Sequence, residues 1–213
     1  MNFDLAERLT FYIPLLLSLT VHEWAHAWTA WKLGDDTARM MGRVSLNPLD
    51  HIDPIGTVLL PLIGIPFGWA KPVPINPVRF RREVSMTMGI LVTAAAGPIS
   101  NLMLAAASVL MIILFGQLDG ILAAKSQAAI QQVLQFAVII NVLLALFNMI
   151  PIPPLDGSRI VDGLVTGKAR TAWDKFCQFG PIMLVAVFLL PMFKINLFEP
   201  PIRWVTTLIE CLT

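Results

Sequence analysis

Charged residues and cysteines are both scarce in this sequence. Asp, Glu, Lys and Arg make up 14% of the 213 residues, whereas they make up roughly a quarter of an average soluble domain. The formal net charge of +1 excludes a strongly basic nucleic-acid binder. The two cysteines, Cys177 and Cys211, are too few for a framework of several disulfide bridges. They also lack the C-x-x-C spacing of a metal or redox pair.

Hydrophobic residues are abundant instead. They account for 56% of the chain, and the mean hydropathy is +0.73, which indicates an integral protein of the lipid bilayer. Because a membrane-spanning helix needs about 20 apolar residues, we predict an all-α polytopic membrane protein with four or five core transmembrane helices. No loop is long enough for a separate soluble domain, so residues 1–213 are expected to form a single membrane-embedded domain. The apolar runs fall at about residues 9–31, 54–70, 86–116, 128–150 and 178–193.

The run at residues 54–70 differs from the others, because prolines and glycines interrupt it at almost every helical turn. We expect this segment to be re-entrant and partly extended (β-like). Irregular backbone at membrane depth is tolerated only where other protein or a water-filled cavity satisfies its hydrogen bonds. The segment therefore predicts a hollow inside the protein.

The distribution of Lys and Arg predicts the orientation, since these residues concentrate in cytoplasmic loops. If residues 54–70 enter the membrane and return, Arg8 and Lys125 lie outside. The difference in the number of Lys and Arg residues between the two sides of the membrane is then larger than if this segment crossed the membrane fully. We predict an outside amino terminus and, from the short loops, a bacterial inner membrane. The cytoplasmic side then holds Lys32, Arg39, Arg43, Lys71, Arg79, Arg81, Arg82, Arg159, Lys168, Arg170 and Lys175.

Two histidines and a glutamate stand inside the first apolar run, in the sequence "SLTVHEWAHAWTAW". His22 and His26 are four residues apart, so both imidazoles lie on one face of a helix, with Glu23 beside the first. In an H-E-x-x-H site the imidazoles bind zinc, and the carboxylate takes a proton from water that the metal acidifies. Ionisable side chains at the bilayer centre cost roughly 2.5 to 3.5 kcal/mol each unless paired or hydrated. Three together therefore indicate a functional site.

A tetrahedral catalytic zinc needs a third protein ligand. The fourth apolar run ends in "FNMIPIPPLDGSRI", where prolines unwind the helix before Asp156. By itself, an Asp-Gly pair after prolines is an ordinary turn. In the predicted orientation, however, the helices that carry His22 and Asn148 both run towards the cytoplasmic face. Asp156 can then fold back to meet His22 and His26.

The chain resembles the site-2 protease family of intramembrane zinc metalloproteases, through "HEWAH" in the first span, "AAGPISN" in the third and "FNMIPIPPLDGSRI" after the fourth. The resemblance covers essentially the whole chain and is to the compact bacterial members that lack a PDZ domain. It implies one zinc ion per chain, bound by His22, His26 and Asp156. It also implies that Glu23 is the catalytic acid/base.

The same resemblance implies the substrate class, namely the transmembrane segments of other membrane proteins. Asn148 is similar to a family asparagine that donates to the oxyanion or holds the substrate backbone. The segment around Leu59–Ala70 occupies the place of a re-entrant element that offers an edge strand to an unwound substrate. The active site is expected nearer the cytoplasmic face, and the sequence carries no signal for an oligomeric state.

Two other functions fit part of the pattern. A divalent-metal transporter also places His and acidic residues inside the membrane, but this sequence has no second cluster of such ligands. A different membrane metalloprotease would use a glutamate as third ligand, but no second helical ligand motif surrounds Glu83, Glu199 or Glu210.

Three further polar residues are expected to have structural roles. We interpret Asn101, four residues after Gly97, as a site of close helix packing ahead of a catalytic role. His51 is expected to be a solvated histidine near the interface, in preference to a gate or a transient metal ligand, and Asn76 a turn residue. The tail "FEPPIRWVTTLIECLT" is predicted to form a short interfacial helix with Trp204 at headgroup level.

Overall fold

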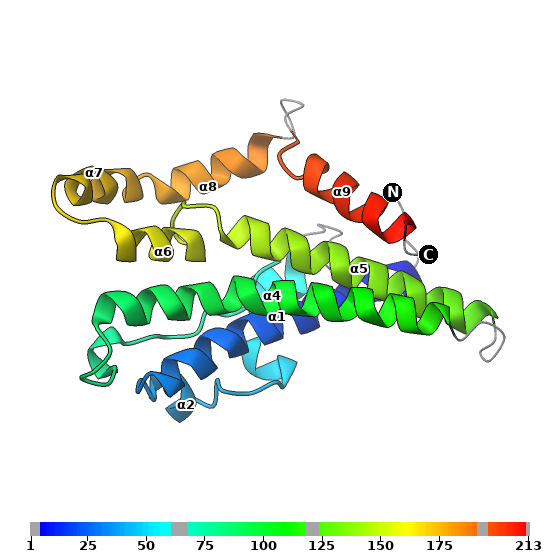
Figure 1. Cartoon of the computed structure of the whole chain (residues 1–213), viewed down its shortest axis with the longest axis horizontal. Helices are drawn as coiled ribbons and strands as arrows, with labels where there is room; N and C mark the ends of the chain where they lie inside the picture. The colour runs from blue at the N-terminus through cyan, green and yellow to red at the C-terminus, as the bar shows by residue number, and fades with distance from the viewer. Residues whose placement is uncertain (1–4, 61–67, 118–123, 191–195, 212–213) are drawn as a thin grey trace.

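The computed structural model describes residues 5–60, 68–117, 124–190 and 196–211. Within these ranges the regular structure is helical and contains no strand, which confirms the all-α class (Figure 1). The longer helices are α1 (Leu5–Lys32), α4 (Met86–Gly116), α5 (Ala124–Asn148), α6 (Asp156–Leu164), α7 (Lys168–Cys177), α8 (Gly180–Leu189) and α9 (Glu199–Glu210). The short ones are α2 (Thr37–Met40), the 3-10 turns η1 (Pro48–His51) and η3 (Pro77–Arg79), and the π-helical turn η2 (Pro54–Leu59).

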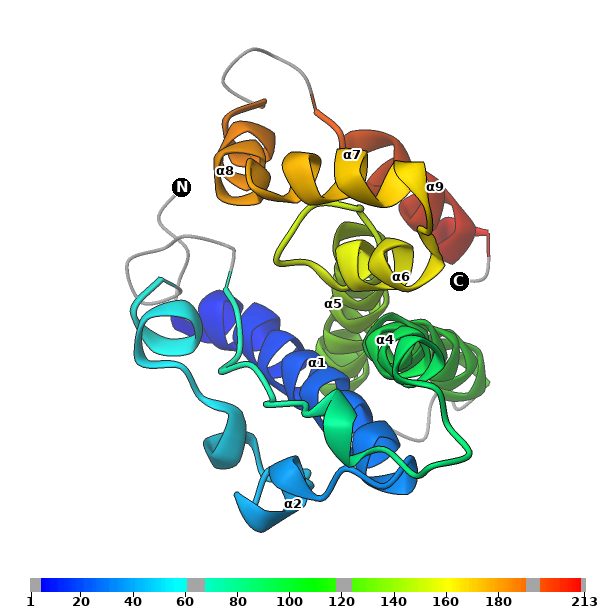
Figure 2. The same cartoon turned by 90° about the vertical axis from the view of Figure 1, so that its left-hand side faces the viewer.

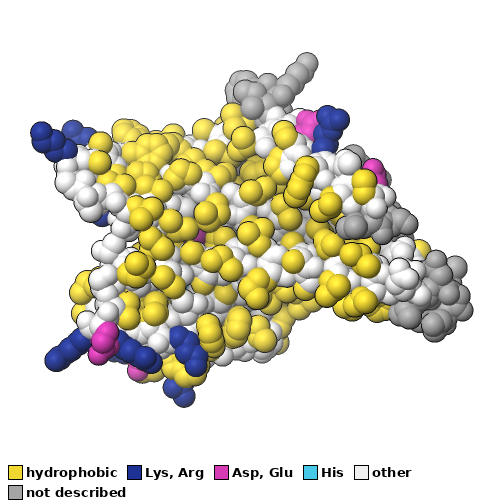
Figure 3. Space-filling model, in the orientation of Figure 1, with side chains coloured by type: hydrophobic (Ala, Val, Ile, Leu, Met, Phe, Trp, Pro, Cys, Tyr) yellow, Lys and Arg dark blue, Asp and Glu magenta, His cyan; other side chains and the backbone are white. Residues whose placement is uncertain are grey.

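Two helices are long and apolar enough to cross a bilayer by length and composition: all of α4, and residues Ser126–Asn148 of α5. In space-filling view, hydrophobic side chains cover the middle of the visible face, while Lys and Arg gather towards its ends (Figure 3). The predicted number of four or five spans stays a prediction. Only ten residues of the fifth apolar run form α8, and residues 191–195 lie outside the described part.

Helix α4 is the centre of the packing, because it contacts α1, α5 and α6, and it lies alongside α5 in both views (Figures 1 and 2). Its residues Ala105 and Ile112 are buried with Val138 of α5 and with Val205 and Ile209 of α9. A second apolar cluster joins α1 and α5 through Leu15, Leu19 and Ile140, together with Ala70. These contacts fix the relative positions of α1, α4 and α5, the three helices that surround the candidate site.

Three boundaries of the long helices near the site have local causes. Ser85 precedes α4, and its Oγ accepts a hydrogen bond from the backbone N–H of Met88 at 3.2 Å. Gly34 follows α1 with a φ of 111°, a left-handed conformation that favours glycine. The prolines after Asn148 prevent α5 from continuing, so the chain turns before α6 begins at Asp156.

The predicted re-entrant segment at residues 54–70 is only partly described, because residues 61–67 lie outside the described ranges. Its first part forms the helical turn η2, in which the Asp53 carboxylate caps the N–H groups of Ile55 and Gly56. The two ends of the segment lie side by side, since Thr57 Oγ1 donates to Trp69 O at 2.8 Å. The re-entrant course itself stays a prediction.

The predicted tail helix is confirmed as α9. Its Val205 and Ile209 are buried against α4 and α5, whereas Trp204 is 67% exposed. This division gives α9 one face on the protein and one away from it. The location of Trp204 at lipid headgroups stays a prediction.

Candidate metal centre

Helix α1 brings the two predicted histidines together. His22 and His26 stand one turn apart on the same face, and each is about 5% exposed. Their ring centroids are 4.6 Å apart, and the two Nε2 atoms are separated by 3.1 Å. The helix therefore points two nitrogen donors at one position.

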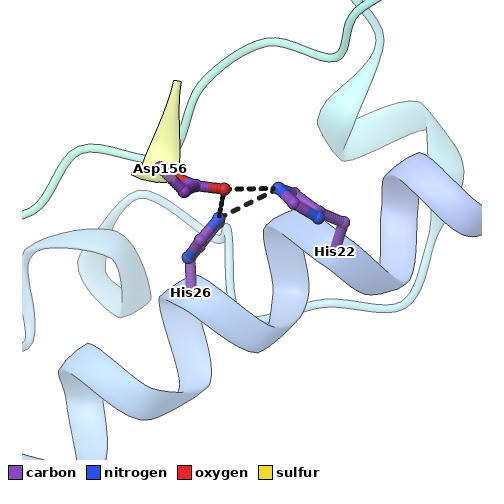
Figure 4. Close-up of side chains that lie close together, drawn as sticks. All are labelled: His22, His26 and Asp156. Carbon is purple, nitrogen blue, oxygen red and sulfur yellow. Dashed lines mark hydrogen bonds and ion pairs between the residues drawn. The ribbon is translucent and has the colours of Figure 1, made fainter. Parts of the chain in front are cut away.

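Asp156 completes the group from the other half of the chain (Figure 4). Its Oδ2 lies 3.1 Å from His22 Nε2 and 3.2 Å from His26 Nε2, and the residue is 7% exposed. Asp156 reaches this place because the chain folds sharply between α5 and α6. A Cβ on the next residue, Gly157, would press against the carbonyl of Met149 and lie 2.7 Å from Ile150 O, so the turn requires glycine.

Helix α4 supports both imidazoles from behind. His22 Nδ1 lies 2.6 Å from Asn101 Oδ1, and His26 Nδ1 lies 2.7 Å from the backbone oxygen of Thr93. Gly97 lies between these contacts along α4, where a Cβ would be 2.6 Å from His22 Cε1 and would also press against His26. Gly97 thus leaves the space that the two rings occupy.

The three converging atoms fit a tetrahedral zinc ion. With bonds of about 2.0 to 2.2 Å to nitrogen and oxygen, neighbouring ligand atoms of a tetrahedron lie about 3.3 Å apart. The separations among Nε2, Nε2 and Oδ2 are 3.1, 3.1 and 3.2 Å. Two imidazoles and one carboxylate leave a fourth position free, as catalytic zinc sites do. In the described residues this is the one group of three or more His, Cys, Asp or Glu side chains that can hold a metal ion.

A cavity of about 490 Å³ opens beside this group, and Glu23 lines it together with His22, His26 and Asp156. The Glu23 carboxylate accepts a hydrogen bond from the backbone N–H of Val73 at 2.9 Å. One oxygen of Glu23 is thereby held in place by a backbone donor. The carboxylate stands at the edge of the cavity and outside the three-ligand group.

Asn148 also lines this cavity. It is the last residue of α5, and its Nδ2 donates to the carbonyl of Leu144 at 3.0 Å. The structure therefore places the predicted catalytic asparagine in the same cavity as the three ligands and Glu23. Its catalytic role stays a prediction.

Residues 68–76 form one wall of the cavity without regular secondary structure. Backbone groups anchor this segment to buried side chains and to neighbouring loops. Lys71 N–H donates to His51 O at 2.9 Å, and Asn76 N–H donates to the fully buried carboxylate of Asp35 at 2.6 Å. With the bond from Val73 to Glu23, these contacts hold the segment along α1.

The interpretation of His51 as a solvated histidine is wrong, because His51 is only 1% exposed. Its Nε2 lies 2.8 Å from Ser45 O, and its Nδ1 lies 3.4 Å from the buried Arg43 guanidinium. Arg43 in turn donates to the carbonyl of Lys71. The histidine is therefore part of the support for residues 68–76. Asn76 caps η3 through its Oδ1, which confirms it as a turn residue.

Sequence reasoning missed the polar group behind His22. Asn101, Asn141 and Ser18 are each at most 2% exposed and are joined by hydrogen bonds across α4, α5 and α1. A signal was present in the sequence, because amide side chains inside apolar helices are costly unless paired. Which partners they pair with depends on the packing of three helices and is not visible in the local sequence.

Comparison with known proteins gives concordant results. The sequence model of Peptidase family M50 matches residues 111–191, a range that includes Asn148 and Asp156. The chain is 39% identical over 180 residues to "Putative zinc metalloprotease YwhC" of Bacillus subtilis, which covers 84% of this chain and 80% of that protein. It is 28% identical over 184 residues to "Putative zinc metalloprotease Rip2" of Mycolicibacterium smegmatis, covering 86% of this chain and 68% of that protein. No solved structure matches the chain significantly.

The bundle of apolar helices, the buried His-His-Asp group and these relatives define the class of the protein, a membrane zinc metalloprotease. Within that class the chain belongs to Peptidase family M50, the site-2 protease family. The resemblance drawn from the three sequence motifs is thereby confirmed.

Proposed function

We propose that the protein is an intramembrane endopeptidase that hydrolyses peptide bonds in the transmembrane segments of other membrane proteins. His22, His26 and Asp156 bind one zinc ion per chain. Glu23 is the general acid/base, and Asn148 holds the substrate backbone or donates to the oxyanion. The observation that carries the proposal is the convergence of three ligand atoms within 3.2 Å beside a cavity that also contains Glu23.

The cavity supports a membrane-derived peptide as the substrate. Most of its lining residues are apolar, and the polar ones are the three ligands with Glu23, Asn148 and Arg159. Such a lining suits the aliphatic side chains of a transmembrane segment, whose burial contributes about 25 cal/mol per Å². The apolar lining comprises Leu19, Trp69, Ala70, Pro72, Val73, Ile75, Leu144, Phe147, Pro154, Leu155 and Leu184, with Gly68.

Peptide hydrolysis requires an activated water, a polarised carbonyl and a proton for the leaving amine. When bound, zinc supplies a Lewis acid that polarises the carbonyl and lowers the pKa of water to about 7. Glu23 takes the proton from the attacking water and delivers it to the amine nitrogen as the C–N bond breaks. The N–H of Val73 holds one carboxylate oxygen, which leaves the other to exchange the proton.

The wall formed by residues 68–76 suits an unwound substrate. A substrate must leave the helical state before a peptide bond reaches the active site, and its backbone groups then need partners. An irregular segment anchored at Lys71, Val73 and Asn76 can offer its remaining backbone groups in the manner of an edge strand. Asn148, at the end of α5, adds a side-chain amide to the lining of the same cavity.

A divalent-metal transporter is less well supported. Ion passage needs further ligands along a path, and within the described ranges only one cluster of possible metal ligands is present. The relatives named as zinc metalloproteases favour the protease as well.

The test is cleavage of a synthetic single-span substrate by the purified protein in detergent. We expect Glu23→Gln to retain zinc and to lose activity by about 10²- to 10⁴-fold, because general acid/base catalysis typically contributes that much. The matched control is Glu83→Gln, which removes an exposed carboxylate elsewhere in the chain. Full activity of the Glu23 variant with zinc bound would show that the assigned acid/base is wrong.

A further inference from the structure

We propose that a directed chain of hydrogen bonds, running from the backbone of α5 through Asn141 and Asn101, fixes the tautomer of His22. Both asparagines are positioning residues for the metal centre. The proposal rests on the proposed zinc-binding role of His22. It assigns a task to Asn101 and Asn141 that helix packing alone does not require.

The direction of this chain of hydrogen bonds is set at the end farthest from His22, by the backbone carbonyl of Ala137. Asn141 Nδ2 lies 2.8 Å from Ala137 O and 2.8 Å from Ser18 Oγ. A carbonyl oxygen can only accept a hydrogen bond, so the amide group of Asn141 must turn its NH₂ towards Ala137. Its Oδ1 then faces Asn101 and acts as an acceptor.

The same reasoning fixes the next amide. Asn101 is fully buried, and the amide atom that faces Asn141 Oδ1 lies 2.8 Å away. Because that oxygen accepts, the facing atom must be Nδ2, which also lies 3.4 Å from the carbonyl of Ser18. Asn101 Oδ1 is thereby directed at His22.

The last step determines where the proton of the imidazole lies. His22 Nδ1 is 2.6 Å from Asn101 Oδ1, and an amide oxygen does not donate. Nδ1 therefore carries the hydrogen, and in a neutral imidazole Nε2 then has a free lone pair. That lone pair points at the position shared with His26 Nε2 and Asp156 Oδ2.

The two histidines reach the same tautomer by different means. His26 Nδ1 donates to the backbone oxygen of Thr93 at 2.7 Å, an acceptor that cannot rotate. His22 faces a side-chain amide, which can present either oxygen or nitrogen unless something holds it. Asn141 and Ser18 supply that restraint, so that His22 is oriented as firmly as His26.

A packing role would not need this network. Two amides buried inside apolar helices cost free energy unless every polar atom finds a partner, and apolar side chains of similar size would fill the same space. Both polar atoms of the Asn101 side chain and both of the Asn141 side chain have hydrogen-bond partners within hydrogen-bonding distance. The completeness and the fixed direction of the network indicate orientation of the metal ligand.

The test measures zinc affinity by chelator competition, independently of proteolysis. Loss of a hydrogen-bond partner behind a histidine ligand typically weakens metal binding by 10- to 100-fold, so we expect about this loss for Asn101→Leu. Asn141→Leu is expected to weaken binding less, because the amide of Asn101 remains but can rotate.

The matched control is Thr20→Val, which removes a buried hydroxyl of α1 that donates to Leu16 O. This variant is expected to bind zinc as the wild type does. A direct readout is the ¹⁵N NMR spectrum of the imidazoles in the zinc-free protein. The wild type should show His22 protonated at Nδ1, whereas Asn101→Leu should show a mixture of tautomers.

The outcomes separate this proposal from the proposed function. Wild-type zinc affinity in Asn101→Leu overturns the positioning role, and so does an imidazole spectrum of Asn101→Leu in which His22 stays protonated at Nδ1 as in the wild type. Asp156→Ala tests the metal centre itself and is expected to lose zinc. If Asp156→Ala binds zinc as tightly as the wild type, the assigned metal centre fails as well.

Discussion

Each residue of the metal group depends on a neighbour that is not a ligand. The imidazoles of His22 and His26 occupy space that exists because Gly97 has no side chain. Asp156 can approach them because Gly157 allows α6 to begin against the turn at Met149. The geometry of the site is therefore as sensitive to added atoms as to the loss of a ligand.

Gly97→Ala tests this sensitivity. The added methyl would lie 2.6 Å from His22 Cε1, well below van der Waals contact, so one or both rings must move. We expect zinc affinity to fall at least about tenfold, in line with other disturbances behind metal ligands, as measured by chelator competition. Gly116→Ala is the control, because nothing lies within 4 Å of a Cβ at the end of the same helix. Equal affinity in the two variants would contradict the steric account.

At the scale of elements, the irregular segment at residues 68–76 is hydrogen-bonded both to the candidate site and to buried charged side chains. Its backbone bonds to Glu23 and Asp35, and Arg43 donates to its Lys71 carbonyl. Backbone donors have a fixed position when their segment is anchored at several points. The segment can therefore hold the Glu23 carboxylate through a backbone N–H.

Val73→Pro tests this function of the backbone, because proline has no N–H to donate to Glu23. Hydrogen bonds to charged groups contribute about 1.5 to 3 kcal/mol, so we expect at least about a tenfold fall in kcat while zinc content is unchanged. Val73→Ala retains the N–H and separates this effect from the loss of the buried side chain. A proline variant as active as the alanine variant would show that the hydrogen bond is unimportant for catalysis.

At the scale of the whole molecule, Lys and Arg are distributed unevenly over the visible face. Clusters lie at the upper and lower corners of the end that carries α2 and α7, and a smaller cluster lies towards the opposite end (Figures 1 and 3). We propose that the end with α2 and α7 faces the cytoplasm of a bacterial cell, with the single domain embedded in the inner membrane. The positive-inside rule is the physical basis of that orientation.

Cys177, at the end of α7, provides a test of orientation. In a Cys211→Ser background, a membrane-impermeant maleimide should label Cys177 in inside-out vesicles and not in intact cells. Burial and the carboxylates of Asp162 and Asp174 raise the pKa of the Cys177 thiol. Only the thiolate reacts, and a raised pKa reduces its fraction at neutral pH, so the labelling rate should increase as the pH is raised from 7 to 8.5.

The control for this experiment lies at the opposite end of the molecule. Ser126 is exposed near the start of α5, on the side predicted to face outwards. Ser126→Cys, in a chain without the two native cysteines, should react in intact cells. Labelling of Cys177 in intact cells would reverse the proposed orientation.

The local sequence was sufficient for the parts of the site that depend on helical periodicity. Two histidines four residues apart share a helix face whatever surrounds them, so His22 and His26 were predictable, as was the end of α5 before its prolines. Asp156 could be predicted only with an assumed topology, because it reaches the histidines over a separation of 130 residues or more along the chain. The helical turn at residues 54–59 was not predicted, although Asp53 and Pro54 together favour one.

By itself, then, the sequence determined the class of chemistry, since the type and spacing of the residues restrict which metal and which reaction they suit. The tertiary structure decided how the donors are oriented. Asn101, Asn141, Gly97 and the N–H of Val73 become meaningful only when α1, α4, α5 and residues 68–76 pack together. The reason is physical: hydrogen bonds and steric contacts depend on distances in space, and distant parts of a chain acquire those distances only on folding.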